Sequence, residues 1–280
     1  MPTVRTCVRI VVICTFIPRF ELIVAAAGRA VLLREPVALA PLPGGERRVG
    51  EVSAAAEAFG IRAGMGLGEA LARCPRLALL PPDPTEVADS WERALTALES
   101  IGAAVEPERP GLACFDARGL RGLYGGIEGV LAATRRALGA PVRIGVAPAR
   151  FCAAAAAARA RPRRAEVVHG GEAGARTYLA PLPVTLLRAR GQTAGLTEAL
   201  ERLGVLTLGE LARLPRAALA DRFGRIGLLA SDLAHGRDGP LVTRSPAERL
   251  EEALELPEAA FGGQLERALE LLIGRLLARR

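Results

Sequence analysis

The chain has 280 residues, of which 50% are hydrophobic, 24% are charged and only 4% are aromatic. A chain of this length can bury more than one core, and its high apolar content excludes a disordered segment. The net charge of +7 and the pI near 10.0 favour an anionic partner, with nucleic acid the first candidate.

The N-terminal region is apolar from Val8 to Ile17, which raises the question of a signal peptide. Arg9 interrupts the run, Pro18 and Arg19 follow it, and it is far shorter than the ~20 residues of a membrane helix. We therefore predict a buried strand over Val8–Phe16 and a cytoplasmic protein that does not contact membranes.

The next segment carries short elements punctuated by glycine and proline. Residues 36–42 and 77–80 are predicted strands, and residues 53–60 and 66–74 are predicted short helices, ended by Gly60 and Pro75. A longer helix is predicted to begin at Asp83-Pro84, since Asp is a good N-cap and Pro fits the first helical position.

The middle of the chain alternates strands and helices. Residues 103–105 and 112–115 are predicted to pair as a hairpin, and a helix follows over 127–138. A strand over 141–146 and an alanine-rich helix over 150–159 come next. This order predicts an α+β fold.

Beyond Val168 the pattern changes to short helices broken by Gly and Pro up to His235. Thr207 and Glu210 form a predicted capping box. Residues 236–246 are predicted to be a polar linker, and a strand over 250–256 and an amphipathic helix over 263–279 follow.

The five cysteines are not at metal-binding spacing, and they are Cys7, Cys14, Cys74, Cys114 and Cys152. His169 and His235 lie far apart, so we expect no zinc site and no cofactor, and we read both histidines as structural. We expect the cysteines to be buried and reduced.

A basic stretch runs from Gly129 to Ala165, where eight arginines occur with no acidic residue. Contact with phosphate groups is the favoured interpretation. A solvated helix face is the alternative.

Two motifs, F-G-[IV]-R-x-G-M at Phe59–Met65 and L-G-[IV]-x-T-x-G-x-L at Leu203–Leu211, occur within this order of elements. Together they make the chain resemble the Y-family translesion DNA polymerases, the DinB/UmuC group, over nearly its whole length. The resemblance implies an α+β palm with a small fingers insertion, an all-α helix-hairpin-helix thumb and an incomplete little finger. The expected boundaries are 1–169 for the palm, with fingers at about 22–80, 170–235 for the thumb, 236–248 for a linker and 249–280 for the start of the little finger.

The same resemblance implies where two Mg²⁺ ions would be held. The family places two Asp residues on its first strand, at the positions of Phe16 and Pro18, and an Asp-Glu pair at the positions of Gly111 and Leu112. None of these four residues has a side-chain carboxylate. Other nearby acids are Glu21, Asp116, Glu106 and Glu108, and we expect the last two to lie on the solvated end of the hairpin.

The resemblance also marks the nucleotide and DNA contacts. The family's triphosphate-binding Tyr and Arg correspond to Ala54 and Glu57, so nucleotide binding is expected to be degenerate. The thumb hairpin corresponds to Gly191-Gln192-Thr193 and keeps one of two glycines; packing alone is a near-equal explanation for this hairpin. The predicted DNA-binding residues are Arg150, Arg159, Arg161, Arg163, Arg164, Arg188, Arg190 and Gly191.

A Y-family frame without these carboxylates is similar to the ImuB-type accessory proteins. This resemblance implies a non-catalytic, DNA-binding protein of DNA-damage tolerance and SOS mutagenesis, which is not itself an enzyme. Its expected partners are DNA, a catalytic error-prone polymerase and other mutasome proteins, while a sliding-clamp contact cannot be assigned. Two alternatives stay open: an active error-prone polymerase that uses displaced carboxylates, and a pure protein-interaction module.

Overall fold

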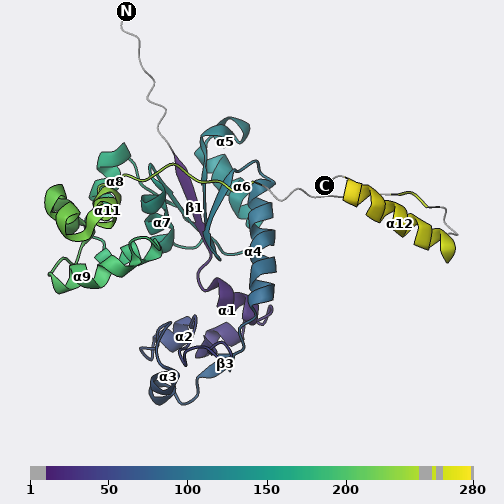
Figure 1. The fold of residues 1–280 in the computed structure, drawn as a ribbon, viewed down its shortest axis with the longest axis horizontal. Coiled ribbons are helices and arrows are strands. Elements are labelled where there is room, and N and C mark those ends of the chain that lie inside the picture. Colours follow the sequence, from purple (N-terminus) through teal and green to yellow (C-terminus); the bar gives the residue numbers. More distant parts are fainter. Residues whose placement is uncertain (1–10, 246–253, 257–260, 279–280) are drawn as a thin grey trace, which may run out of the picture. The chain divides into compact units, whose positions relative to one another are not determined.

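The computed structural model describes residues 11–245, 254–256 and 261–278, and Figure 1 shows its elements. The chain divides after Arg244 into two units, 1–244 and 245–280. The first unit contains a central sheet, an inserted module between its first strand and helix α4, and a helical module after its last strand.

The central sheet is built around one apolar strand. Its order is β4 (Val105–Arg109), β5 (Leu112–Asp116), β1 (Val12–Phe16), β6 (Arg143–Ala147) and β7 (Glu166–Val167). β1 is antiparallel to both β5 and β6, whereas β7 is parallel to β6. β1 is buried on both faces, as its continuous apolar sequence indicates, and the predicted strand is confirmed over Val12–Phe16. Residues 8–10 of the prediction lie outside the described part.

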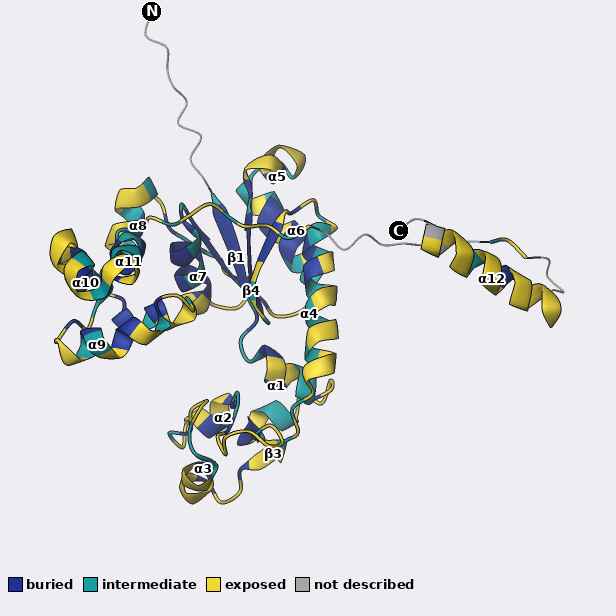
Figure 2. Ribbon diagram, in the orientation of Figure 1, coloured by how far each residue is buried: buried dark blue, intermediate teal, exposed yellow. Residues whose placement is uncertain are grey.

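Figure 2 shows that the central strands are largely buried, and alternate residues of a strand point to opposite faces of the sheet. Ile13 and Phe115 pack with Leu98 of α4 (Pro84–Glu99) and Leu131 of α6 (Ile127–Leu138). Val12 faces the other way, toward α7 (Arg150–Arg159). The short helix α5 (Arg118–Leu123) follows β5.

Helix α7 lies directly on β6 because the residues at their contact have small side chains or none. A Cβ atom on Gly145 would lie 2.1 Å from the Ala153 carbonyl oxygen and 2.2 Å from the Ala157 nitrogen. The alanine-rich sequence of α7 thus serves close packing of helix on strand.

Cys14 and Cys114 form a disulfide, which corrects the expectation that all cysteines are reduced. The two residues are direct partners in the β1–β5 ladder, with Cα atoms 4.1 Å apart. Their separation of 100 residues hid this pairing from spacing arguments. Cys74 and Cys152 are free and buried, as expected, and Cys7 lies outside the described residues.

The inserted module has a small core of its own. Its elements are α1 (Phe20–Ala25), η1 (Leu32–Arg34), β2 (Val37–Leu39), α2 (Ala54–Glu57), α3 (Leu67–Arg73) and β3 (Ala78–Leu80). β2 and β3 pair in parallel, and Ala38, Ala56 and Ile61 are fully buried beneath the helices. Asp83 caps α4 by accepting from the Glu86 amide at 2.9 Å, as predicted.

The helical module shares its core with the α7 face of the sheet. It comprises α8 (Gly171–Leu179), η2 (Val184–Ala189), η3 (Ala194–Leu196), α9 (Thr197–Arg202), α10 (Leu208–Arg213) and α11 (Arg216–Ala234). Leu179, Leu187 and Leu208 are fully buried in the same cluster as Val12. The predicted capping box of Thr207 and Glu210 is confirmed. One core therefore joins this module to the sheet.

The second unit contains α12 (Gly263–Ala278), the predicted C-terminal helix. The predicted strand over 250–256 falls mostly outside the described residues, and Leu254–Leu256 are not in a strand. Within the described ranges, no helix combines the length and apolarity that a membrane span requires.

Candidate functional site

The four positions that correspond to the family's metal ligands lie at one end of the central strands. Phe16 on β1 is the direct register partner of Leu112 on β5. Both line a cavity of about 140 Å³, between the sheet, α7 and η2. Arg109 lies over the Phe16 ring, with its guanidinium carbon 5.5 Å from the ring centroid. This end of the sheet therefore presents apolar groups at the positions where the sequence resemblance implies carboxylates.

Gly111 has no room for a carboxylate in this backbone. It adopts φ 82°, and a Cβ atom would lie 2.8 Å from both the Ile17 carbonyl oxygen and the Phe20 Cβ. The Gly111 carbonyl accepts a hydrogen bond from the Ile17 amide at 2.8 Å. The turn between β4 and β5 thus packs on the end of β1 in a way that any side chain would disrupt.

Glu106 and Glu108 do not lie on a solvated end, which corrects that expectation. Their side chains are 12% and 14% exposed, and each forms an ion pair with Arg150. Arg190 pairs with Glu108 at 2.8 Å and with Asp238 at 2.7 Å. We call these five residues, Glu106, Glu108, Arg150, Arg190 and Asp238, the ion network.

Burial controls the ionisation of this network. It raises the pKa of Glu108, and Asp238 raises it further, while Arg190 and Arg109 act in the opposite direction. Burial also lowers the pKa of Arg190. Sequence reasoning missed Asp238, because no local pattern connects it to β4 or α7.

These residues do not fit a pair of magnesium ions. Mg²⁺ requires oxygen ligands in nearly octahedral geometry, and the carboxylates of the ion network are already bound to arginine. Among the residues that the structure describes, no group of three or more His, Cys, Asp or Glu side chains could hold a metal ion.

Glu57, which the sequence resemblance places at a triphosphate contact, forms an ion pair with Arg19. Arg19 donates to Glu57 at 2.7 Å and to the Val52 carbonyl at 2.7 Å. Both charged residues line a cavity of about 590 Å³ together with Glu51. Burial raises the pKa of Glu51, which accepts a hydrogen bond from the Leu22 amide at 3.0 Å. Ala54 begins α2. Sequence reasoning missed Arg19, although its charge between Pro18 and Phe20 could have drawn attention.

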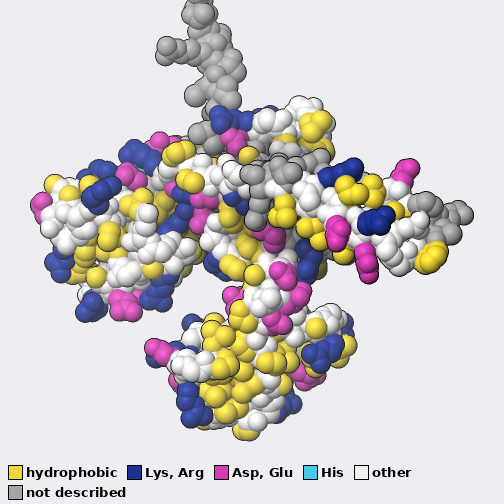
Figure 3. Space-filling view, turned by 45° about the vertical axis from the view of Figure 1, so that its right-hand side comes forward, with side chains coloured by type: hydrophobic (Ala, Val, Ile, Leu, Met, Phe, Trp, Pro, Cys, Tyr) yellow, Lys and Arg dark blue, Asp and Glu magenta, His cyan; other side chains and the backbone are white. Residues whose placement is uncertain are grey.

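The predicted DNA-binding arginines separate into two groups. Arg150 and Arg190 are 13% and 14% exposed in the ion network, which corrects the expectation that they face phosphate. Arg188 bonds Thr197 and Glu201, and Arg159 lies close to Tyr178. Arg161, Arg163 and Arg164 are exposed after α7, and no acceptor for their side chains occurs in the described part of the chain. In Figure 3 arginine side chains lie spread over the surface, with acidic side chains between them.

The turn at Gly191 leaves two backbone amides without a partner among the described residues. Gly191 and Gln192 are exposed, and their amides have no acceptor within the described residues. Thr193 is fully buried and donates its hydroxyl to the Leu187 carbonyl at 2.7 Å. The second glycine of the pattern is thus replaced by a residue that anchors the turn to η2.

The structure thus combines a five-stranded sheet, in which β1 and β5 pair in the interior, with an inserted module and a helical module. The profile of the impB/mucB/samB family matches residues 16–158, about half of the chain, and the chain belongs to this family of Y-family translesion DNA polymerases.

Two bacterial relatives are both named DNA polymerase IV. The protein from Caulobacter vibrioides is 28% identical over 249 residues, which cover 85% of this chain and 60% of the relative. The protein from Dehalococcoides mccartyi (strain CBDB1) is 31% identical over 240 residues, covering 82% and 60%. The chain therefore spans 60% of the length of these two relatives.

A solved structure, "Dbh Ternary Complex (substrates partially disordered)", has a TM-score of 0.62 and 19% identity, covering 81% of this chain and 67% of that chain. This likeness confirms the predicted α+β fold class. The expectation that the chain is not an enzyme is wrong, because the two relatives are named DNA polymerase IV and the fold matches that of Dbh.

Proposed function

We propose that the chain serves DNA-damage tolerance as a DNA-binding accessory of translesion synthesis. The observation that carries this proposal is the exposed group of Arg161, Arg163 and Arg164, since three side chains without internal acceptors are available for phosphate oxygens. The free amides at Gly191 and Gln192 support a second backbone contact.

The proposal includes the domain roles and partners. Residues 1–169 act as a palm with fingers at about 22–80, residues 170–235 as a thumb, 236–248 as a linker and 249–280 as the start of a little finger. A catalytic error-prone polymerase and other mutasome proteins are the proposed protein partners.

Salt-dependent DNA binding tests the proposal. Arg161→Gln, Arg163→Gln and Arg164→Gln together should weaken binding to a labelled primer–template and reduce the log–log salt slope by about 0.9 for each phosphate that is no longer neutralised. The control replaces Arg34, Arg47 and Arg121, three exposed arginines elsewhere, with Gln. Equal salt slopes in the two triple variants would show that Arg161, Arg163 and Arg164 do not contact DNA.

Nucleotide addition by the chain itself is a second candidate, favoured by the polymerase names of the relatives. Glu108 lines the same cavity as Phe16 and Leu112, and Glu106 precedes it on β4. Primer extension by the purified chain, abolished in Glu106→Gln and Glu108→Gln variants that still fold, would support this candidate. Extension that is unchanged in those variants would argue against a role for these acids.

A further inference from the structure

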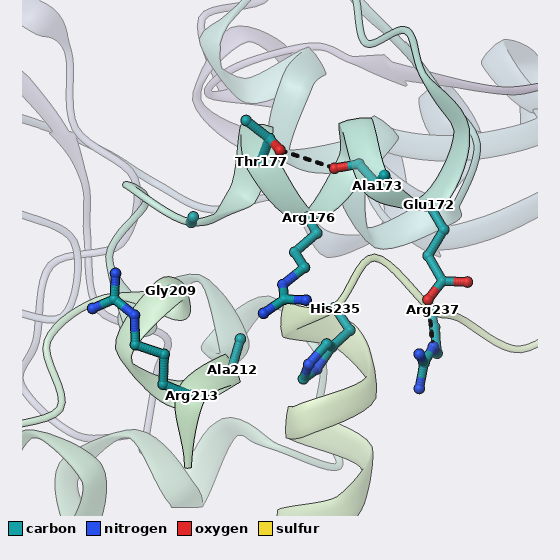
Figure 4. Close-up of a pocket in the computed structure, with 10 residues that line it drawn as sticks. Glu172, Ala173, Arg176, Thr177, Gly209, Ala212, Arg213, His235 and Arg237 are labelled. Carbon is teal, nitrogen blue, oxygen red and sulfur yellow. Dashed lines mark hydrogen bonds and ion pairs between the residues drawn. The ribbon is translucent and has the colours of Figure 1, made fainter.

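A second basic site lies in the helical module, apart from the ion network and the Gly191 hairpin. A cavity of about 720 Å³ opens between α8, α10 and the end of α11 (Figure 4). Its charged and imidazole side chains are Glu172, Arg176, Arg213, His235 and Arg237.

The arginines that line the cavity differ in their ion pairs. Arg237 donates to Glu172 at 2.6 Å and lies 3.9 Å from Asp232, so its charge is partly neutralised. Arg176 and Arg213 are exposed and form no hydrogen bond or ion pair with any described residue, although Arg213 lies close enough to Glu210 to help lower the pKa of that carboxyl. Figure 4 shows Arg176 extending from α8 toward His235, while the side chain of Arg213 on α10 points away from Arg176. The site therefore has an excess of positive charge.

Glycines make the walls of the cavity closely packed. A Cβ atom on Gly209 would lie 2.8 Å from the Ala180 carbonyl oxygen, and one on Gly236 would lie 2.6 Å from the Ala175 Cβ. Gly236 also has φ 77°. Because the chain segments approach so closely at these points, the three helices hold the arginines on a preformed frame.

The remaining lining favours carboxylate over phosphate. Ala173, Ala180 and Ala212 provide small apolar surface that fits an aliphatic stem. The amides of Leu208 and Gly209, at the start of α10, already donate to Leu182 and Ala180 at 2.9 Å, so they are not available to cradle a phosphate. No Phe, Tyr or Trp lines the described cavity, and His235 is its one ring.

We propose that this cavity is a docking site for an acidic, partly apolar segment of a partner protein. Glutamate or aspartate carboxylates of the segment accept hydrogen bonds from Arg176 and Arg213, in the bidentate geometry that guanidinium groups offer. Aliphatic groups of the segment cover the alanines. None of the residues that line the cavity belongs to the Arg161, Arg163 and Arg164 group or to the Gly191 turn, so we expect the cavity to stay accessible while DNA is bound.

Fluorescence anisotropy tests the proposal with a fluorescein-labelled peptide of alternating glutamate and leucine. Arg176→Gln with Arg213→Gln should weaken peptide binding by at least about tenfold, since two charge-assisted hydrogen-bonding groups are removed. Affinity for a labelled primer–template should stay within about twofold of wild type. The matched control is Arg34→Gln with Arg47→Gln, the same charge change on exposed arginines of the inserted module.

A second variant keeps both arginines. Ala173→Glu adds a competing carboxylate at an exposed helical position and should also weaken peptide binding. Unchanged peptide binding in both variants would overturn the proposal. An equal loss of peptide and DNA binding in the arginine variant would overturn it too, because the cavity would then belong to a general anionic or nucleic-acid surface. Urea unfolding midpoints that match wild type exclude misfolding as the cause.

Discussion

Arg190 donates to Asp238 at 2.7 Å, and this contact joins the helical-module hairpin to the segment that leaves α11. Asp238 also bonds Arg150 at 3.1 Å and the Phe151 amide at 2.9 Å, at the start of α7. Its side chain is only 5% exposed. One carboxylate thus holds three segments together beside the cavity that Phe16 and Leu112 line.

Replacing Asp238 with Asn should destabilise the chain by about 3 kcal/mol, because two arginines in a poorly solvated site would lose a negative partner. Urea unfolding measures the difference. Glu69→Gln is the control, since Glu69 pairs with Arg73 on the exposed surface of α3 and should cost no more than about 1 kcal/mol. Equal losses in the two variants would show that the ion network adds no more than a surface pair.

Many elements could be predicted because their signals are local. The Asp83-Pro84 start of α4 and the Thr207–Glu210 capping box depend on residues close together in the sequence, and both are confirmed. The apolar run of β1 is equally local. The Cys14–Cys114 bond joins residues 100 apart, so it depends on the β1–β5 register, which composition and spacing do not determine.

The site was predictable only in part for the same reason. Motif register identified Phe16, Gly111, Leu112 and Glu57 as changed positions. It could not show that a side chain at position 111 would collide with Ile17, because that requires the turn geometry. Nor could it show that Arg150 faces inward, since Asp238 lies 88 residues away.

The close packing of α7 on β6 leads to a second prediction. Gly145→Ala places a methyl group 2.1 Å from the Ala153 carbonyl oxygen, so the helix must shift and stability should fall by about 2 kcal/mol or more. Thermal unfolding measures this loss. Gly119→Ala is the control, because Gly119 lies in α5 with nothing within 4 Å of an added Cβ. The control should be neutral or stabilising by up to about 1 kcal/mol, and a similar loss in both would contradict the packing argument.

The ionisation of Glu51 makes a pH prediction. Burial raises its pKa above the ordinary value of 4.5, so the folded state favours the protonated form. Its contribution to stability is therefore present below pH 4.5 and is lost as the pH rises through the folded pKa. Glu51→Gln, which keeps an acceptor for the Leu22 amide, should raise stability at pH 7 and leave it unchanged near pH 4.

Glu86 provides the opposite sign for comparison. Hydrogen bonds from Arg93 and Ser90 lower its pKa, so its contribution is present above the ordinary pKa and is lost as the pH falls through the folded value. Glu86→Gln should therefore reduce stability at pH 7. Unfolding curves of both variants across the acid range test these two predictions. A loss of stability at pH 7 in both variants would refute the raised pKa of Glu51.

The Arg19–Glu57 pair makes the last prediction, which concerns nucleotide binding. Glu57 is 51% exposed at the mouth of the 590 Å³ cavity and neutralises the nearby cation. Glu57→Gln removes a charge that repels triphosphate and frees Arg19 to attract it, so affinity for a labelled deoxynucleoside triphosphate should rise about fivefold, the effect of roughly 1 kcal/mol between solvated charges. Anisotropy titration measures this affinity.

The control is Glu69→Gln, which makes the same charge change on α3 at a residue that does not line the cavity. The nucleotide affinity of this variant should match wild type. An equal rise in both variants would mean that only net charge matters, and no rise in Glu57→Gln would mean that Arg19, held by the Val52 carbonyl, cannot reach the nucleotide.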